Sequence, residues 1–239
     1  MTPSSKGSFR IFSVGGISVF MHWSWFVVAI LEVNDPVGRY RSLGWNAAEY
    51  FALFGMVLMH EFGHALACRS VGGDARQIVL WPLGGVAYVN PPMRPGAMLC
   101  SIAAGPLVNV ALGFLLTLVI VFGMMQPWWT QGSELRMFLL SLWVINAVLL
   151  AFNLLPVYPL DGGKILWSLL WFFLGCGRAL AVASVIGIVG VIGLLGLAVL
   201  ARSVWLAIIG VFVLLNCWGG LLVARQMLRR DSEMPPPLE

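Results

Sequence analysis

Two histidines and a glutamate lie within an otherwise apolar stretch of the sequence, MHEFGHALA. His60 and His64 are four residues apart, so a helix would present both imidazoles on one face, one turn apart. Glu61 follows the first histidine and is the one formal charge in the surrounding apolar run. The H-E-x-x-H pattern is typical of two zinc ligands with a glutamate as general base. A charge in a membrane-spanning segment is costly, which favours such a site over a polar cluster that merely joins helices.

Two histidines do not complete a catalytic zinc site, which usually has three protein ligands and one open position. Asp161 is the carboxylate in the fourth apolar run of the chain. Like His64, it lies a few residues before a basic residue, so the two are expected at comparable depth. Cys68, one turn beyond His64, is a rival third ligand. His22 is also available, but its place near an interface favours a structural role.

The composition is that of an integral membrane protein. The 239 residues are 60% hydrophobic and 10% charged, whereas a soluble domain has about 25% charged residues. The net charge of +4 is spread along the chain. This distribution indicates a topology signal and no nucleic-acid partner.

Six apolar runs predict the fold class, because a spanning helix needs about 20 residues. We predict an all-α membrane protein, a six-span polytopic helical bundle, with spans at 16–32, 46–68, 96–124, 137–163, 179–200 and 203–224. The fourth span is expected to be broken in NLLPVYPLDGG (153–163), because its two prolines cannot lie in a regular helix. Residues 164–175 are expected to continue this span or to lie at the interface.

A small membrane-associated β-hairpin is predicted between spans two and three. Short β-prone runs at 78–80 and 86–89 flank a proline and two glycines. Two interpretations stay open: an ordinary connecting hairpin, or an open strand edge that pairs with an extended peptide. In the second interpretation the candidate substrate strand comprises Val86, Ala87 and Tyr88.

The domain organisation is predicted to be simple. Residues 1–230 form one transmembrane core. The polar, proline-rich segment 231–239 is expected to be a disordered cytoplasmic tail.

The motifs together resemble the site-2 protease family of intramembrane zinc metalloproteases. That family pairs HExxH with an N-x-x-P-x-x-P-x-D-G type motif, which is matched here by Asn153, Pro156, Pro159, Asp161 and Gly162. AAGPLVN (103–109) resembles the third span of the family, and PLGGVA (82–87) resembles its membrane-associated strand. The resemblance extends over nearly the whole chain and implies a minimal catalytic core without a PDZ or CBS domain.

The resemblance also implies the chemistry. One Zn²⁺ per chain would be held by three ligands, His60, His64 and Asp161. Glu61 would be the catalytic base for hydrolysis of peptide bonds in or near transmembrane segments, that is, regulated intramembrane proteolysis. Asn153 is the expected oxyanion donor, and Asn109 is a second candidate for substrate contact. The implied partners are a transmembrane protein or peptide substrate and membrane lipid; the sequence does not indicate an oligomeric state.

Two alternatives use the same ligands. A zinc-binding membrane transporter also places histidine and aspartate within spans, and a pseudoprotease would bind membrane helices without cleaving them. A transporter does not need a glutamate beside its first ligand, so Glu61 favours hydrolysis.

Charge placement predicts the topology. If the N-terminus is cytoplasmic, the six spans put ten of the 14 lysines and arginines in cytoplasmic segments. This bias fits the positive-inside rule with both termini in the cytoplasm. We expect a multi-pass protein of a prokaryotic inner membrane.

Cysteine labelling tests this topology. In a background with the four native cysteines replaced by alanine, single cysteines are introduced by Ser5→Cys, Thr130→Cys and Ser232→Cys. A membrane-impermeant reagent added outside should label position 130 and leave positions 5 and 232 unlabelled, because six crossings return the chain to its starting side. External labelling at position 5 or 232 would contradict the six-span map.

Overall fold

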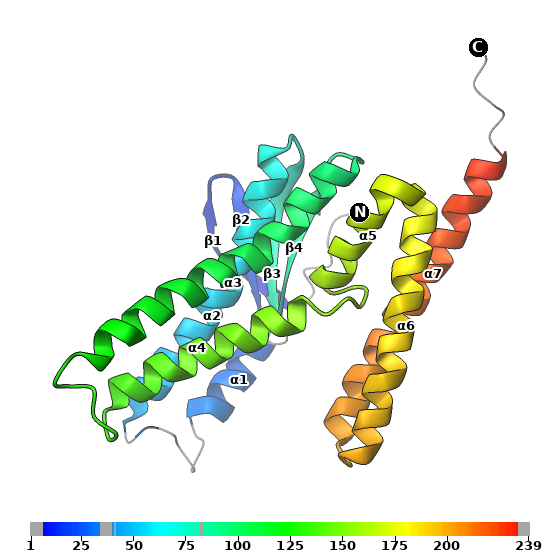
Figure 1. The fold of residues 1–239 in the computed structure, drawn as a ribbon. Coiled ribbons are helices and arrows are strands. Elements are labelled where there is room, and N and C mark those ends of the chain that lie inside the picture. Colours follow the sequence, from blue (N-terminus) through cyan, green and yellow to red (C-terminus); the bar gives the residue numbers. More distant parts are fainter. Residues whose placement is uncertain (1–6, 34–39, 41, 82–83, 234–239) are drawn as a thin grey trace. The chain divides into compact units, whose positions relative to one another are not determined.

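The computed structural model describes residues 7–33, 40, 42–81 and 84–233 (Figure 1). The chain divides into two compact units, which are described separately. The first comprises Met1–Pro92 and Ala103–Leu150, and the second comprises Met93–Ile102 and Ala151–Glu239.

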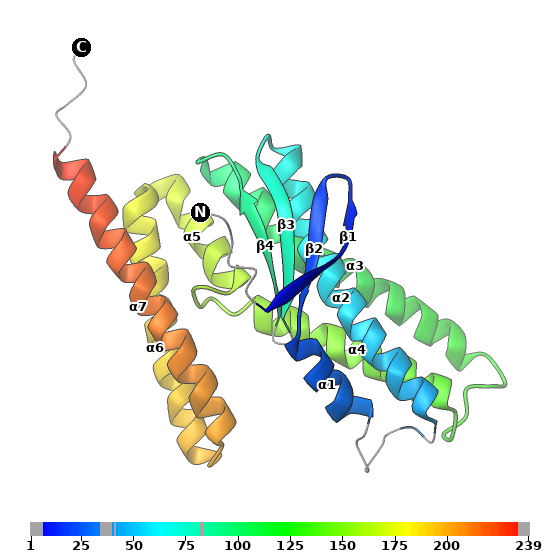
Figure 2. The same cartoon turned by 180° about the vertical axis from the view of Figure 1, so that it is seen from behind.

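A four-stranded sheet lies in the first unit, in the order β1-β2-β3-β4 (Figure 2). Its strands are β1 (Ser8–Val14), β2 (Ile17–His22), β3 (Asp74–Trp81) and β4 (Gly84–Asn90). The β1/β2 and β3/β4 pairs are antiparallel, and β2/β3 is parallel. β4 is therefore an edge strand of this sheet.

The sheet confirms one prediction and corrects another. β3 and β4 form the predicted strand pair, with Ile78 opposite Ala87 and Val79 opposite Val86. Pro82 and Leu83, within the predicted turn, lie outside the described residues. The described residues are mostly helical, as predicted, but β1 and β2 extend the predicted two-stranded hairpin to a four-stranded sheet.

The predicted helical span 16–32 is also wrong as a single helix. It contains β2, followed after one residue by the short helix α1 (Ser24–Val33). Ile17 and Val19 are buried in the core between the sheet and α2. The apolar residues of 16–32 that lie in β2 are therefore explained by packing of the strand in this core. The six-span count stays a prediction.

Three long helices pass through the first unit: α2 (Leu43–Ser70), α3 (Pro95–Met124) and α4 (Glu134–Asn153). α3 begins in the second unit and α4 ends in it. Within the first unit, α2 packs closely against α3. A Cβ atom on Gly63 would lie 2.8 Å from the carbonyl oxygen of Ala104, so glycine permits this approach of the two backbones.

One face of the sheet packs against the half of α2 that carries the HExxH motif. The core between them is made of side chains from both elements: Ile17, Val19, Val57, Ala65, Cys68, Ile78 and Leu80. The sheet thereby fixes the rotation of α2 about its own axis.

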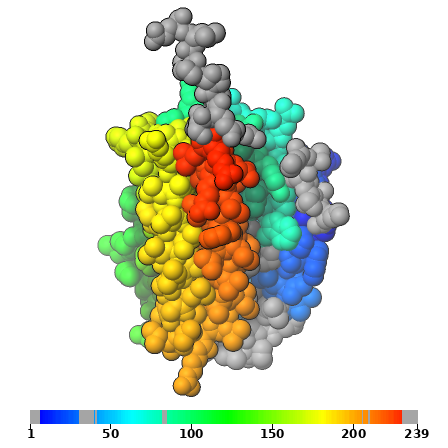
Figure 3. All heavy atoms as spheres, turned by 90° about the vertical axis from the view of Figure 1, so that its right-hand side faces the viewer, coloured from blue at the N-terminus to red at the C-terminus, as the bar shows by residue number. Residues whose placement is uncertain are grey.

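The second unit contains α5 (Asp161–Leu174), α6 (Cys176–Leu200) and α7 (Val204–Glu233). α6 and α7 lie side by side along their length (Figure 3). Val191 of α6 and Val213 and Cys217 of α7 share a core with Val157, which lies in the segment before α5. Five described helices are long and apolar enough to cross a membrane, namely α2, α3, α4, α6 and α7, so this is a multi-pass membrane protein.

The predicted fourth span corresponds to α4, a segment that is not helical at 154–160, and α5. Pro156 and Pro159 both lie in the segment between the helices, and residues 164–175 fall almost entirely in α5. That these pieces form one broken span stays a prediction. α7 runs to Glu233, and residues 234–239 of the predicted tail lie outside the described residues.

Candidate metal centre

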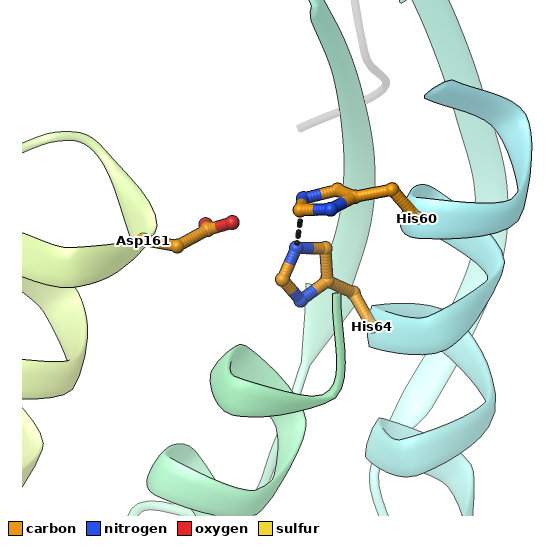
Figure 4. A group of neighbouring side chains, drawn as sticks. All are labelled: His60, His64 and Asp161. Atoms are coloured by element: carbon orange, nitrogen blue, oxygen red, sulfur yellow. Dashed lines mark hydrogen bonds between the residues drawn. The ribbon is translucent and has the colours of Figure 1, made fainter. Parts of the chain in front are cut away.

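His60 and His64 lie on successive turns of α2, with their rings turned toward each other (Figure 4). Their Nε2 atoms are 3.1 Å apart, and both side chains are buried. Two nitrogens that are each about 2.0–2.1 Å from a tetrahedral zinc ion lie about 3.3–3.4 Å apart. The pair is therefore spaced as two ligands of one ion would be.

Gly105 of α3 borders the space beside these nitrogens. A Cβ atom built on Gly105 would overlap Nε2 of His64 and would lie 2.8 Å from Nε2 of His60. Among the twenty residues, glycine alone leaves this volume open while α3 remains packed against α2.

Asn109, one turn further along α3, contacts the other side of the His60 ring. The Nδ1–H of His60 donates to Oδ1 of Asn109 at 2.7 Å, because an amide oxygen can only accept. This leaves the lone pair of His60 on Nε2, where a metal could bind. The structure thus places Asn109, the predicted substrate-contact residue, against His60, a candidate metal ligand.

Glu61 is buried against the edge strand β4. Its Oε2 accepts the backbone N–H of Ala87 at 2.7 Å. A Cβ atom on Gly85 would lie 2.6 Å from Oε1 of Glu61, so the glycine lets the carboxylate approach the strand. Val86 and Tyr88, the other candidate strand residues, flank Ala87.

Asp161 and Asn153 belong to the second unit. Asp161 is the first residue of α5 (Figure 4), and Asn153 is the last residue of α4. Cβ atoms on Gly162 and Gly163 would overlap the backbone of Leu154 and of Tyr158, respectively. The segment that precedes α5 is therefore folded back on its first turn, and the two glycines allow this fold.

Cys68, the rival ligand, packs elsewhere in the first unit. Its Sγ lies 3.6 Å from the carbonyl oxygen of Asp74, and its side chain is part of the core beneath the sheet. His22 has the structural surroundings that its sequence position indicated. Its Nδ1 is 2.6 Å from Oγ of Ser24, and its ring stacks on Trp81.

Two features of the site were not found from the sequence. The role of Gly105 depends on the approach of α3 to α2, and the contact of Asn109 depends on the same packing. The sequence signal for both residues was the AAGPLVN segment (103–109). Its resemblance to a family motif did not assign a role to Gly105.

The chain belongs to Peptidase family M50. Residues 48–133 and 121–197 match this family, which together is more than half of the chain. The expected relationship to the site-2 protease family is thereby confirmed, and zinc is the metal that this family implies.

Individual relatives agree with this assignment. A zinc metalloprotease of Methanocaldococcus jannaschii is 30% identical over 206 residues, which cover 86% of this chain and 58% of that protein. Stage IV sporulation protein FB of Bacillus subtilis is 32% identical over 118 residues, which cover 48% of this chain and 37% of that protein. The chain thus spans less than two thirds of the length of either relative.

A solved structure shares the fold. The site-2 protease from Methanocaldococcus jannaschii matches with a TM-score of 0.61 and 26% identity, over 90% of this chain and 95% of that chain. This chain therefore shares its overall fold with that protease.

The residues of the first unit fit zinc. Two imidazole nitrogens converge with suitable spacing, Asn109 contacts Nδ1 of His60 and not the Nε2 that faces His64, and Gly105 leaves room beside both rings. Neutral imidazole is among the usual ligands of zinc.

Gly105→Ala tests the space beside the histidines. We expect zinc affinity to fall at least about tenfold, as when other residues that support a metal site are changed, because the added methyl group overlaps His64 Nε2. Zinc per chain is measured by mass spectrometry after dialysis against a graded chelator, and helix content by circular dichroism.

Gly55→Ala on α2 is the matched control, since a Cβ atom there meets no atom within 4 Å. It should bind zinc as the wild type does. Alanine favours a helix over glycine, so lost helix propensity cannot explain a defect in Gly105→Ala. Wild-type zinc affinity in Gly105→Ala would remove Gly105 from the site.

Proposed function

We propose that this protein is an intramembrane zinc metalloprotease that hydrolyses peptide bonds in or near the transmembrane segments of membrane proteins. The observation that carries the proposal is the position of Glu61 beside His60 and His64 within α2. α2 is long and apolar enough to cross a membrane, and the three polar side chains are buried there. Family membership and the names of the relatives support the same activity.

The proposed third ligand is Asp161. Its support is the family motif that it matches, its place at the start of α5, and the need of a catalytic zinc for a third protein ligand. The folded-back segment 154–160 and its paired glycines give this carboxylate a fixed backbone. One zinc ion per chain would then be held by two imidazoles and one carboxylate.

Zinc, when bound, supplies a Lewis acid that activates water near neutral pH and polarises a peptide carbonyl. Glu61 is the proposed base: its carboxylate takes a proton from the attacking water and delivers it to the departing amine. Asn153 is the proposed donor to the oxyanion, because its side-chain amide can stabilise developing negative charge.

The edge of β4 is the proposed binding surface for the extended part of the substrate, through Val86, Ala87 and Tyr88. An edge strand presents unpaired backbone groups that can pair with a peptide. The hydrogen bond from Ala87 N–H to Glu61 occupies one backbone group of this edge, so the peptide would pair with the other groups of the edge, and it puts the proposed base next to the strand.

The proposed setting is a prokaryotic inner membrane, with both termini in the cytoplasm. The substrate is a transmembrane protein or peptide, and the surrounding partner is lipid. A helical substrate hides its amides within the helix, so it must unwind locally before it can pair with β4.

Zinc analysis of single variants tests the ligand set. Asp161→Ala should lose zinc at least about tenfold more readily than the wild type, since one of three ligands is missing. Cys68→Ala should retain it. Metal content is measured on the folded fraction from size-exclusion chromatography. Full retention in Asp161→Ala, or loss in Cys68→Ala, would contradict the proposed ligand set.

Glu61→Gln tests the base. The amide keeps the shape of the side chain but cannot accept a proton as a carboxylate does, so cleavage should fall about 10²–10⁴-fold while zinc stays bound. The assay is cleavage of a single-span test substrate in liposomes, with zinc uptake measured in parallel.

Asp74→Asn is the control for charge, because Asp74 pairs with Arg76 and both side chains are exposed. It should cleave as the wild type does. Undiminished cleavage by Glu61→Gln would rule out this mechanism, and zinc flux without any cleavage would favour a transporter.

A further inference from the structure

A pair of buried asparagines connects α3 and α4 behind His60. Asn146 of α4 donates its Nδ2–H to the backbone oxygen of Asn109 at 2.8 Å. Asn109 in turn accepts the Nδ1–H of His60 at 2.7 Å. Both asparagines are almost fully buried, at 0% and 2% exposure, so the chain of contacts from α4 to His60 is shielded from water.

We infer that Asn109 and Asn146 are positioning residues that set the tautomer of His60, and through it the zinc affinity of the site. The inference rests on the proposed role of His60 as a zinc ligand. A neutral imidazole carries its proton on either Nδ1 or Nε2. The tautomer with Nδ1–H leaves Nε2 able to bind a metal, whereas the tautomer with Nε2–H does not.

The orientation of the Asn109 amide decides between these tautomers. With Oδ1 toward His60, the ring must donate from Nδ1. If the amide turned over, its NH₂ group would donate to Nδ1 and the ring proton would move to Nε2. The position of the Asn109 backbone therefore affects which amide atom faces His60. Asn146 holds that backbone in place through its hydrogen bond to the Asn109 carbonyl oxygen.

Gly113 makes the anchor possible. A Cβ atom on Gly113 would lie 3.1 Å from Nδ2 of Asn146, which is a tight contact, so a larger residue would push the α4 amide away from α3. The glycine at position 113 thus lets Asn146 of α4 reach the backbone of Asn109, which lies one turn before Gly113 on α3.

The pair is poorly explained by stability alone. Nδ2 of Asn109 and Oδ1 of Asn146 are buried and have no hydrogen-bond partner among the described residues. Buried polar atoms without partners destabilise a fold, and apolar groups of the same shape can be neutral or stabilising in their place. Control of the His60 tautomer therefore explains these two buried amides better than packing does.

The first test measures the tautomer in metal-free protein. The chain has only three histidines, so a spectrum of protein labelled with ¹⁵N-histidine contains three imidazoles, and assignment by His22→Gln and His64→Gln is direct. At a pH where the rings are neutral, wild-type His60 should be protonated on Nδ1. Asn109→Leu should shift it toward protonation on Nε2.

The second test measures zinc affinity by chelator competition in a series of variants. Asn109→Asp keeps an oxygen that accepts Nδ1–H and should bind zinc within a few-fold of the wild type. Asn109→Leu should bind about 10–100-fold more weakly. Asn146→Leu should weaken zinc binding in the same direction without lowering the thermal unfolding temperature.

A purely structural role predicts the opposite order. Leucine would then be tolerated better than a buried carboxylate at position 109, and Asn146→Leu would lower the unfolding temperature without changing zinc affinity. Asn216→Leu is the matched control, because Asn216 donates within its own helix, to the carbonyl oxygen of Phe212. It should change neither the tautomer of His60 nor zinc affinity.

The two tests distinguish failure of the tautomer inference from failure of the proposed ligand role of His60. An unchanged His60 tautomer in Asn109→Leu would overturn this inference, whatever the protein is found to cleave. If the tautomer shifts as expected and no variant of His60 affects zinc binding, then the tautomer control stands and the proposed ligand role of His60 is wrong.

Discussion

Two imidazole nitrogens that face each other at 3.1 Å within an apolar helix are the constraint on which the first unit depends. Polar side chains in such a place are costly to bury without partners. The partners come from other elements. Oδ1 of Asn109 on α3 accepts a hydrogen bond from Nδ1 of His60, and the backbone N–H of Ala87 on β4 donates to Glu61. Glycines lie where these side chains come closest to a neighbouring backbone: Gly105 lies beside both rings, and Gly85 lies beside the Glu61 carboxylate.

The sheet meets a second constraint, because buried backbone amides need hydrogen-bond partners. Pairing in a sheet provides them between strands, whereas an edge strand needs partners from elsewhere. β2 and β3 have a paired neighbour on both sides, and Glu61 accepts one edge N–H of β4. In the proposed mechanism the same edge would hold Glu61 in place and offer neighbouring groups to a peptide. Packing of the sheet on α2 connects the two proposed roles, since it fixes the helix that carries His60 and His64.

The sequence predicted the histidine pair better than the architecture. The spacing of His60 and His64 predicted that their rings share one face of a helix, and the two Nε2 atoms lie 3.1 Å apart, because helix geometry converts a four-residue interval into one face. Residues 78–89 predicted β3 and β4 from their β-prone runs. β2 was missed, because Ile17 and Val19 are as apolar as a membrane span and composition does not report pairing. Gly105 and Asn146 were also missed, since their roles arise only when α3 and α4 pack beside α2.

X-ray absorption at the zinc edge tests the central claim most directly, because it reports the atoms around the metal in the purified protein. The account predicts one zinc per chain, with imidazole nitrogens and oxygens as neighbours at about 2.0–2.2 Å. The imidazole signal should correspond to two rings. A sulfur neighbour at about 2.3 Å would identify a cysteine ligand and contradict the His60, His64 and Asp161 site, as would a signal from fewer than two imidazoles.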